Sequence, residues 1–160
     1  MTIRLVANED PRWTSYAIDH LEEFQDEVGA TTTEWIAHVR QEITAGTPSS
    51  RKPDRPGAEL FEIFVGDQHV GDVVVIPCWG THEIDIAVWK PFQGKGYGTL
   101  ALREIVAMTV PSRFPIVQAT IRQSNRNKRR VRSQLISQGF QCIHPSDDDL
   151  EIWEYPSQEV

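Results

Sequence analysis

The residues best suited to chemistry in this sequence form a glycine-rich run, Gln93-Gly94-Lys95-Gly96-Tyr97-Gly98. Glycine lacks a Cβ atom, so it lets the backbone approach a ligand closely. The run comes directly before a helical pattern, and the first N–H groups of a helix have no partner within it. The helix dipole adds partial positive charge at the same end. Together these features predict an anion site suited to a phosphate group.

A strand pattern precedes the glycines and a helix pattern follows them. In the strand, Ile84, Ile86 and Val88 alternate with Glu83, Asp85 and Ala87, the period-two pattern of a half-buried strand. Pro91 ends it, because proline cannot donate to a ladder. After the glycines, Ala101, Leu102, Ile105 and Met108 fall on one helical face, and Pro111 ends the helix. The order strand, glycine turn, helix supports a ligand-binding turn.

The spacing of the glycines excludes two common nucleotide motifs. Thr99 stands where a dinucleotide fingerprint needs its third glycine, and no glycine-lysine-serine/threonine run follows. The pattern Gln93-x-x-Gly96-x-Gly98 instead resembles motif A of the GCN5-related N-acetyltransferase (GNAT) superfamily, Q/R-x-x-G-x-G/A, which cradles the pyrophosphate of acetyl-CoA. The segment GKGYGTLAL, residues 94–102, is similar to the same segment in the GNAT subgroup that resembles the ribosomal-protein alanine acetyltransferases.

The resemblance implies a set of cofactor-binding residues. Backbone amides of Gln93, Gly94, Lys95, Gly96, Tyr97 and Gly98 would face the pyrophosphate, and Ala87 and Val88 would pair with the pantetheine arm like an added strand. A later stretch resembles motif B of the family, an asparagine, a helix and a closing Gly139-Phe140. Asn127, or alternatively Asn125, would contact the cofactor arm. Family asparagines usually lie about one residue nearer the Gly-Phe pair, so the choice between the two stays open.

The reaction implied by the family is direct attack of a neutral amine on the acetyl thioester, with acetyl-CoA as co-substrate. An ammonium group must first lose a proton, which requires a base. His82 occupies a position that several family branches use for this base, and Glu83 or Asp85 would serve instead if the sheet faces are reversed. The family tyrosine that protonates the departing thiolate is replaced by Leu135, so Ser133, a water or no acid at all fills that role.

Length and composition favour one ordinary globular domain spanning residues 1–160. No apolar run approaches the ~18 residues needed to cross a bilayer, and the N-terminus lacks a signal pattern, so a cytoplasmic location is expected. Cys78 and Cys142 match no metal-binding or redox spacing and are expected to be reduced. The net charge of −7 argues against general nucleic-acid affinity and is compatible with amine-bearing substrates. The sequence is compatible with a homodimer as well as with a monomer.

The remaining patterns complete the element order β-α-α-β-β-β-α-β-α-β-β. Thr2–Ala7, Ala58–Val65, Val70–Pro77, Ile116–Ile121, Gln141–His144 and Leu150–Tyr155 are predicted strands. One amphipathic helix runs from about Trp13 to Gly29, and a second follows the capping box Thr31–Glu34. The apolar stripe of the first helix, in which His20 is packed, consists of Trp13, Tyr16, Ala17, His20, Leu21, Phe24 and Val28. The order matches the GNAT fold, which implies a single mixed, mostly antiparallel sheet of about seven strands flanked by about four helices, with strands splayed at the cofactor site.

Two hypotheses of different class follow. The first is an acyltransferase that moves an acetyl group from acetyl-CoA to a primary amine, on a small molecule or a protein N-terminus. The alternative is a GNAT-fold module that binds CoA or RNA with little catalysis, which Leu135 and the basic stretch Arg122–Arg132 allow. Asp147, Asp148 and Asp149 lie in the loop that walls the family's acceptor pocket and are candidates to attract a cationic amine.

Overall fold

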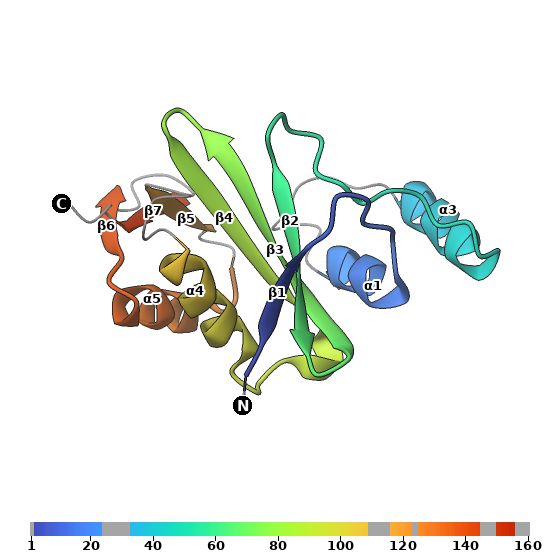
Figure 1. The fold of residues 1–160 in the computed structure, drawn as a ribbon. Helices are drawn as coiled ribbons and strands as arrows, with labels where there is room; N and C mark the ends of the chain where they lie inside the picture. Colours follow the sequence, from blue (N-terminus) through green and yellow to red (C-terminus); the bar gives the residue numbers. More distant parts are fainter. Residues whose placement is uncertain (1, 24–32, 109–115, 123–124, 145–149, 156–160) are drawn as a thin grey trace.

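A computed structural model describes residues 2–23, 33–108, 116–122, 125–144 and 150–155 of the chain. The strands are β1 (Arg4–Ala7), β2 (Glu59–Val65), β3 (Gln68–Cys78), β4 (Thr81–Val88), β5 (Val117–Arg122), β6 (Gln141–His144) and β7 (Leu150–Tyr155). The helices are α1 (Ser15–Glu23), α3 (Thr33–Thr44), the 3-10 turn η1 (Lys90–Phe92), α4 (Tyr97–Ala107) and α5 (Lys128–Ser137). Their order confirms the predicted succession of strands and helices (Figure 1).

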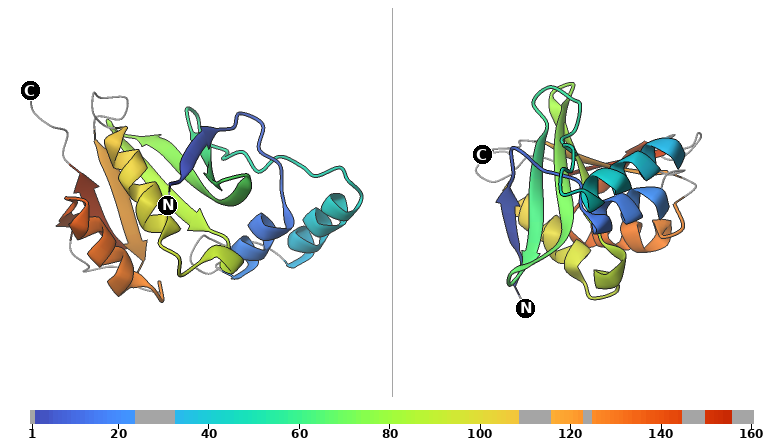
Figure 2. Two further views of the ribbon diagram at one scale, coloured as in Figure 1. Left: turned by 60° about the horizontal axis from the view of Figure 1, so that its bottom comes forward. Right: turned by 90° about the vertical axis from the view of Figure 1, so that its right-hand side faces the viewer.

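The strands form one 7-stranded sheet in the order β1-β2-β3-β4-β5-β7-β6. All neighbours are antiparallel except β4 and β5, which run parallel. This mixed, mostly antiparallel sheet with flanking helices is the predicted GNAT architecture (Figures 1 and 2).

The parallel pair is short. Only His82 and Glu83 of β4 have partners on β5, Val117 and Gln118. The pairing starts with a 2.8 Å hydrogen bond from the amide of His82 to the carbonyl of Ile116. The rest of β4 remains paired with β3, through to Val88. The two strands therefore part after Glu83, and the sheet opens along the C-terminal part of β4.

Helices α4 and α5 pack against this opening and build the main core. Ala101, Leu102 and Ile105 of α4 are buried, as the sequence pattern predicted, and they belong to one cluster with Ile84 of β4. Leu135 of α5 joins the same cluster. A 2.9 Å hydrogen bond from Gln134 Nε2 to Thr99 Oγ1 links the two helices, which lie side by side in Figures 1 and 2.

Helices α1 and α3 pack on each other and form a smaller cluster of Ile18, Ile36 and Val39 (Figures 1 and 2). The predicted apolar stripe of α1 is wrong in detail: Ile18, which the stripe left out, is fully buried, while Tyr16 is 45% exposed. The reason is that α1 has two neighbours. Ile18 faces α3, whereas Tyr16 stands edge-on to Phe92 of η1, with ring centroids 5.5 Å apart. The predicted helix end at Gly29 and the first two residues of the capping box, Thr31 and Thr32, lie outside the described residues.

The β2–β3 hairpin turns more tightly than predicted. The predicted turn covered Gly66–His69, but strand pairing continues to Val65 and Gln68, leaving only Gly66 and Asp67 in the loop. Gly66 adopts a φ of 60°, which glycine reaches without steric cost, and this permits the two-residue connection. His69 therefore lies in β3, beside Phe64.

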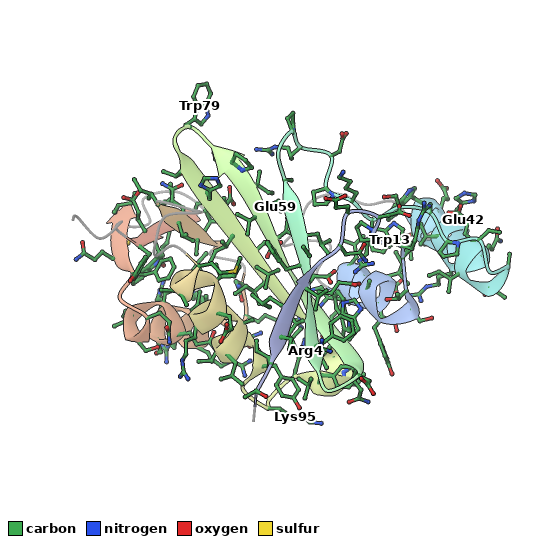
Figure 3. The ribbon with its side chains drawn as sticks, in the orientation of Figure 1. Arg4, Trp13, Glu42, Glu59, Trp79 and Lys95 are labelled. Carbon is green, nitrogen blue, oxygen red and sulfur yellow. The ribbon has the colours of Figure 1, made fainter. Side chains whose placement is uncertain are left out.

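The loop between α3 and β2 is tied to the chain before α1 along residues 49–51. The amide of Trp13 donates to the carbonyl of Ser49, and the amide of Arg51 donates to the carbonyl of Pro11. Trp79 projects from the tip of the β3–β4 hairpin and is 100% exposed (Figure 3). Cys78 and Cys142 are free thiols. Among the described helices, none is long and apolar enough to cross a membrane.

Candidate active site

The glycine-rich turn stands between the end of β4 and the start of α4. Gly94 and Gly96 have φ angles of 78° and 84°, in the left-handed region that favours glycine. The side chain of Gln93 turns back, and its Nε2 donates to the carbonyl of Val88 over 2.9 Å. The first hydrogen bond of α4 runs from Leu100 N–H to the carbonyl of Gly96, so the amides before it have no acceptor within the helix. These amides can bind an anion.

The turn opens onto a cavity of about 650 Å³ that lies where β4 and β5 part. Five of the six turn residues line it, Gln93, Gly94, Gly96, Tyr97 and Gly98, together with Val88 and both candidate asparagines, Asn125 and Asn127. Lys95 is exposed and does not line it; in Figure 3 it lies beside the turn at the bottom of the view. Ala87 does not line it either, and its register partner on β3 is Asp72. The cavity thus begins at the anion-binding turn and extends between β4 and β5.

The candidate catalytic residues of the sequence analysis separate into two groups. Glu83 and Asp85 line the cavity, and Thr120 Oγ1 of β5 donates to Glu83 Oε1 over 3.4 Å. His82 is not among the lining residues, although it is the immediate neighbour of Glu83 on β4. Ser133 is exposed on α5, and its Oγ donates to the carbonyl of Arg129 over 3.1 Å.

Leu135 lines the cavity at the position where the family has its tyrosine, and it is buried. Among the described side chains that line the cavity, hydroxyl groups belong to Tyr97, Thr99 and Thr120. Thr99 already receives a hydrogen bond from Gln134, and Thr120 donates to Glu83. The leucine thus makes this wall apolar where the family has a proton donor.

The sequence analysis did not place two basic side chains, His20 and Arg130, in the cavity wall. Arg130 lies in the first turn of α5, and its Nη2 donates to Asn127 Oδ1 over 3.2 Å. Its place in a basic stretch gave no sign of which arginine faces the ligand. The neighbouring Arg132 is engaged elsewhere, through hydrogen bonds to Glu151 of β7. The hydrogen bonds from Arg132 to Glu151 raise the pKa of the guanidinium.

His20 reaches the cavity from α1, where the sequence pattern placed it among core residues. Its ring stands edge-on to the indole of Trp89, with centroids 5.6 Å apart. Burial lowers the pKa of His20 below its usual value, although the charges of Glu23 and Asp72 act in the opposite direction. The sequence pattern could not show that this histidine borders a cavity, since that depends on the opening between β4 and β5.

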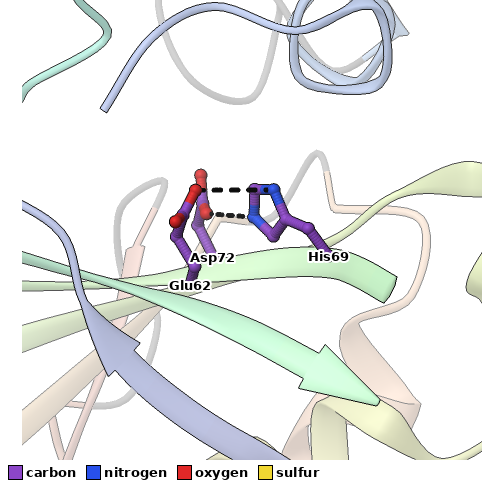
Figure 4. A group of neighbouring side chains, drawn as sticks. All are labelled: Glu62, His69 and Asp72. Carbon is purple, nitrogen blue, oxygen red and sulfur yellow. Dashed lines mark hydrogen bonds and ion pairs between the residues drawn. The ribbon is translucent and has the colours of Figure 1, made fainter. Parts of the chain in front are cut away.

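A second polar group lies on β2, β3 and the loop before them and consists of Arg51, Glu62, His69 and Asp72, called here the Arg51 cluster. Figure 4 shows His69 beside the two carboxylates: Nε2 lies 2.8 Å from Asp72 Oδ1 and Nδ1 lies 3.5 Å from Glu62 Oε2. Glu62, His69 and Asp72 are close enough together to hold a metal ion.

The guanidinium of Arg51 already supplies the positive charge beside Glu62 and Asp72 that a metal ion would supply. It donates to both oxygens of Asp72 and to Oε2 of Glu62 at distances of 2.9 to 3.1 Å. Burial would lower the pKa of Arg51, but its hydrogen bonds to Asp72 and Glu62 outweigh burial and raise it. A metal ion would have to displace this permanently charged group, so the donor set fits a structural ion-pair network better than a metal centre.

Comparison with known proteins agrees with this fold. The family model described as an acetyltransferase (GNAT) domain matches residues 1–135. No curated protein sequence matches the chain.

Solved structures share the fold at low sequence identity. An acetyltransferase from Thermus thermophilus is 18% identical with a TM-score of 0.60, covering 98% of this chain and 97% of its own. The Campylobacter jejuni N-acetyltransferase PseH, in complex with acetyl coenzyme A, is 14% identical with a TM-score of 0.60, covering 98% and 99%. The ribosomal-protein-S18-alanine N-acetyltransferase from Escherichia coli is 13% identical with a TM-score of 0.56, covering 99% and 95%.

Proposed function

Because this chain belongs to the GNAT acetyltransferase family, we propose that it transfers the acetyl group of acetyl-CoA to a primary amine carried by a small molecule or a protein N-terminus. As a member of the family it is an N-acetyltransferase with acetyl-CoA as co-substrate. The acceptor is the part that we propose. The observation that carries it is the pair of carboxylates, Glu83 and Asp85, in the wall of the cavity that begins at the glycine turn.

The two ends of the cavity suit the two substrates. At the turn, backbone amides and glycines with positive φ favour the pyrophosphate of the acetyl donor. Val88 and Asn127 are the proposed contacts of the pantetheine arm, with Asn125 as the alternative asparagine. Toward the N-terminal end of β4, the negative charges of Glu83 and Asp85 favour a cationic ammonium group. A thioester held between these ends would meet an amine at short range, and such positioning supplies much of the catalytic effect.

The test is a panel of acceptors assayed by release of the CoA thiol from acetyl-CoA. The panel contains alkyl diamines, aminosugars, amino acids and short peptides with free N-termini, and matched N-acetylated peptides serve as controls. We expect thiol release with at least one free amine and none with its acetylated counterpart. The Glu83→Gln and Asp85→Asn variants should raise the KM for a cationic acceptor and leave the affinity for acetyl-CoA unchanged.

A thermal melt separates donor binding from acceptor choice. A ligand that binds only the folded state raises the melting midpoint by mass action, so acetyl-CoA and CoA should raise it and ATP should raise it less. Acetyl-CoA binding without thiol release across the amine panel would contradict the proposed acceptor class and leave the donor site intact.

A further inference from the structure

His20 lies in the cavity wall although it comes from α1, outside both family motifs. Trp89 holds the ring from one side, and Trp89 is itself fixed by a 2.8 Å hydrogen bond from its amide to the carbonyl of Val70. The cavity also takes in Asp85 and Ile86, the middle of the opened strand. An imidazole in this wall can therefore meet a ligand that lies along β4.

The charges around His20 are largely compensated. Glu23 follows it by one turn of α1, and its Oε1 lies 4.0 Å from Lys90 Nζ and 3.9 Å from Arg126 Nη2. Asp72, from β3, carries the double hydrogen bond of Arg51. His69 stands on Trp89 as well, with ring centroids 5.5 Å apart. Glu23 and Asp72 each have a cation beside them, and burial has the largest effect on His20: it lowers the pKa, so the ring is neutral at neutral pH.

We propose that His20 is the general base of the acetyl transfer, accepting a proton from the ammonium group of the acceptor. This inference rests on the proposed function and names the residue that makes the amine nucleophilic. The freed nitrogen lone pair attacks the carbonyl carbon, the C–N bond forms and the C–S bond breaks. The nitrogen loses two protons in all: one passes through His20 to solvent, and the other ends on the CoA sulfur.

This assignment gives the polar groups of the cavity different roles. Glu83 and Asp85 attract and hold the ammonium group, which needs negative charge. Proton removal at neutral pH requires a base that is unprotonated at that pH, and a neutral imidazole is such a base. His20 supplies that neutral imidazole.

The experiment compares His20→Gln with wild type, using an amine that the wild type acetylates, over a range of pH. At neutral pH we expect kcat/KM to fall about 100-fold, the usual contribution of a general base, with the affinity for acetyl-CoA unchanged. The deficit should shrink as the pH approaches the pKa of the acceptor, because the amine then arrives unprotonated. His38→Gln is the matched control, since His38 is exposed on α3 and pairs with Glu42 at 3.6 Å.

A deficit that is equal at every pH would show a structural role and overturn the proposal, and so would full activity of His20→Gln. If His20→Gln fails to bind acetyl-CoA, the pH dependence of the wild type is measured instead. Its kcat/KM must decline in acid as a single group titrates below about 6.5. A kcat/KM that stays constant in acid overturns the proposal. Failure of the proposed function looks different, because the wild type itself would then release no thiol with any amine.

Discussion

Arg51 and Asp72 are joined by two parallel hydrogen bonds, Nε to Oδ2 and Nη2 to Oδ1, each 3.1 Å long. The same guanidinium donates to Glu62 Oε2 over 2.9 Å and to the backbone carbonyl of Arg12. The Arg51 side chain is only 4% exposed. One buried cation thus joins β2, β3 and the segment before α1, and it compensates a carboxylate that lies near His20.

Replacing Arg51 by methionine should destabilise the protein by about 3 kcal/mol, because removing one partner leaves buried carboxylates uncompensated. Urea unfolding of Arg51→Met and wild type measures this difference. The matched control is Arg40→Met, since Arg40 bonds Asp19 and Glu22 but is 39% exposed. That control should cost less than about 1 kcal/mol. Equal losses in the two variants would mean that burial adds nothing to the Arg51 pairs.

Gly96 and Gly98 should respond differently to alanine. Gly96 has a φ of 84°, and alanine in this conformation costs about 1–2 kcal/mol. Relaxation of the turn would move its amides, so we expect Gly96→Ala to weaken acetyl-CoA binding about tenfold, the equivalent of about 1.4 kcal/mol. Isothermal titration calorimetry with acetyl-CoA measures the change.

Gly98 supplies the control for this prediction. It lies inside α4, and an added Cβ would meet Val88 Cγ2 at 3.7 Å, an ordinary contact. The family pattern also allows alanine at this position. Gly98→Ala should therefore keep both its stability and its affinity for acetyl-CoA. If the two variants lose affinity equally, the positive φ of Gly96 is not what shapes the binding turn.

The sequence predicted the strand, the glycine turn and α4 because these elements are contiguous and each has its own periodicity. It could not choose between His82 and the pair Glu83 and Asp85. That choice depends on which side chains of β4 border the cavity, and the cavity forms by pairing and separation of segments far apart in the chain. His20 was placed in the core for the same reason: an apolar stripe shows which face of a helix packs, but not that a cavity adjoins it.

Arg130 and Arg129 are neighbours in the basic stretch of α5, yet only Arg130 lines the cavity. Arg130→Gln should raise the dissociation constant of acetyl-CoA by about 5- to 10-fold, the loss of roughly 1 kcal/mol for one exposed charged contact to a phosphate. Arg129→Gln removes the same charge from the same helix and should leave the constant unchanged. Calorimetry at low and high salt measures both.

The salt series shows whether Arg130 acts through a specific contact. A specific contact predicts that only Arg130→Gln weakens binding and that its affinity depends less on salt than that of wild type. Equal effects of the two substitutions would instead indicate that the whole basic stretch attracts the phosphates through its summed charge.

The lowered pKa of His20 also predicts how the stability of the protein responds to acid. In the unfolded chain this histidine takes up a proton near pH ~6.5, whereas burial lowers its pKa in the folded chain. Between the two values the unfolded state binds more protons, so acid favours unfolding. The contribution of neutral His20 is complete above about pH 6.5 and declines as the pH falls toward the folded-state pKa, by at most about 1.4 kcal/mol per pH unit.

The difference between wild type and His20→Gln isolates this effect from the other titrating groups. Urea unfolding at about pH 7.5 and about pH 5.5 should show wild type losing more stability in acid than His20→Gln, because glutamine does not titrate. His38→Gln retains His20 and should follow wild type. A steeper acid loss in His20→Gln would mean that the imidazole is stabilised in its charged form, with Glu23 and Asp72 outweighing burial. A histidine already charged at neutral pH cannot accept the proton of the acceptor, so the same result would also remove the physical basis for His20 as the base.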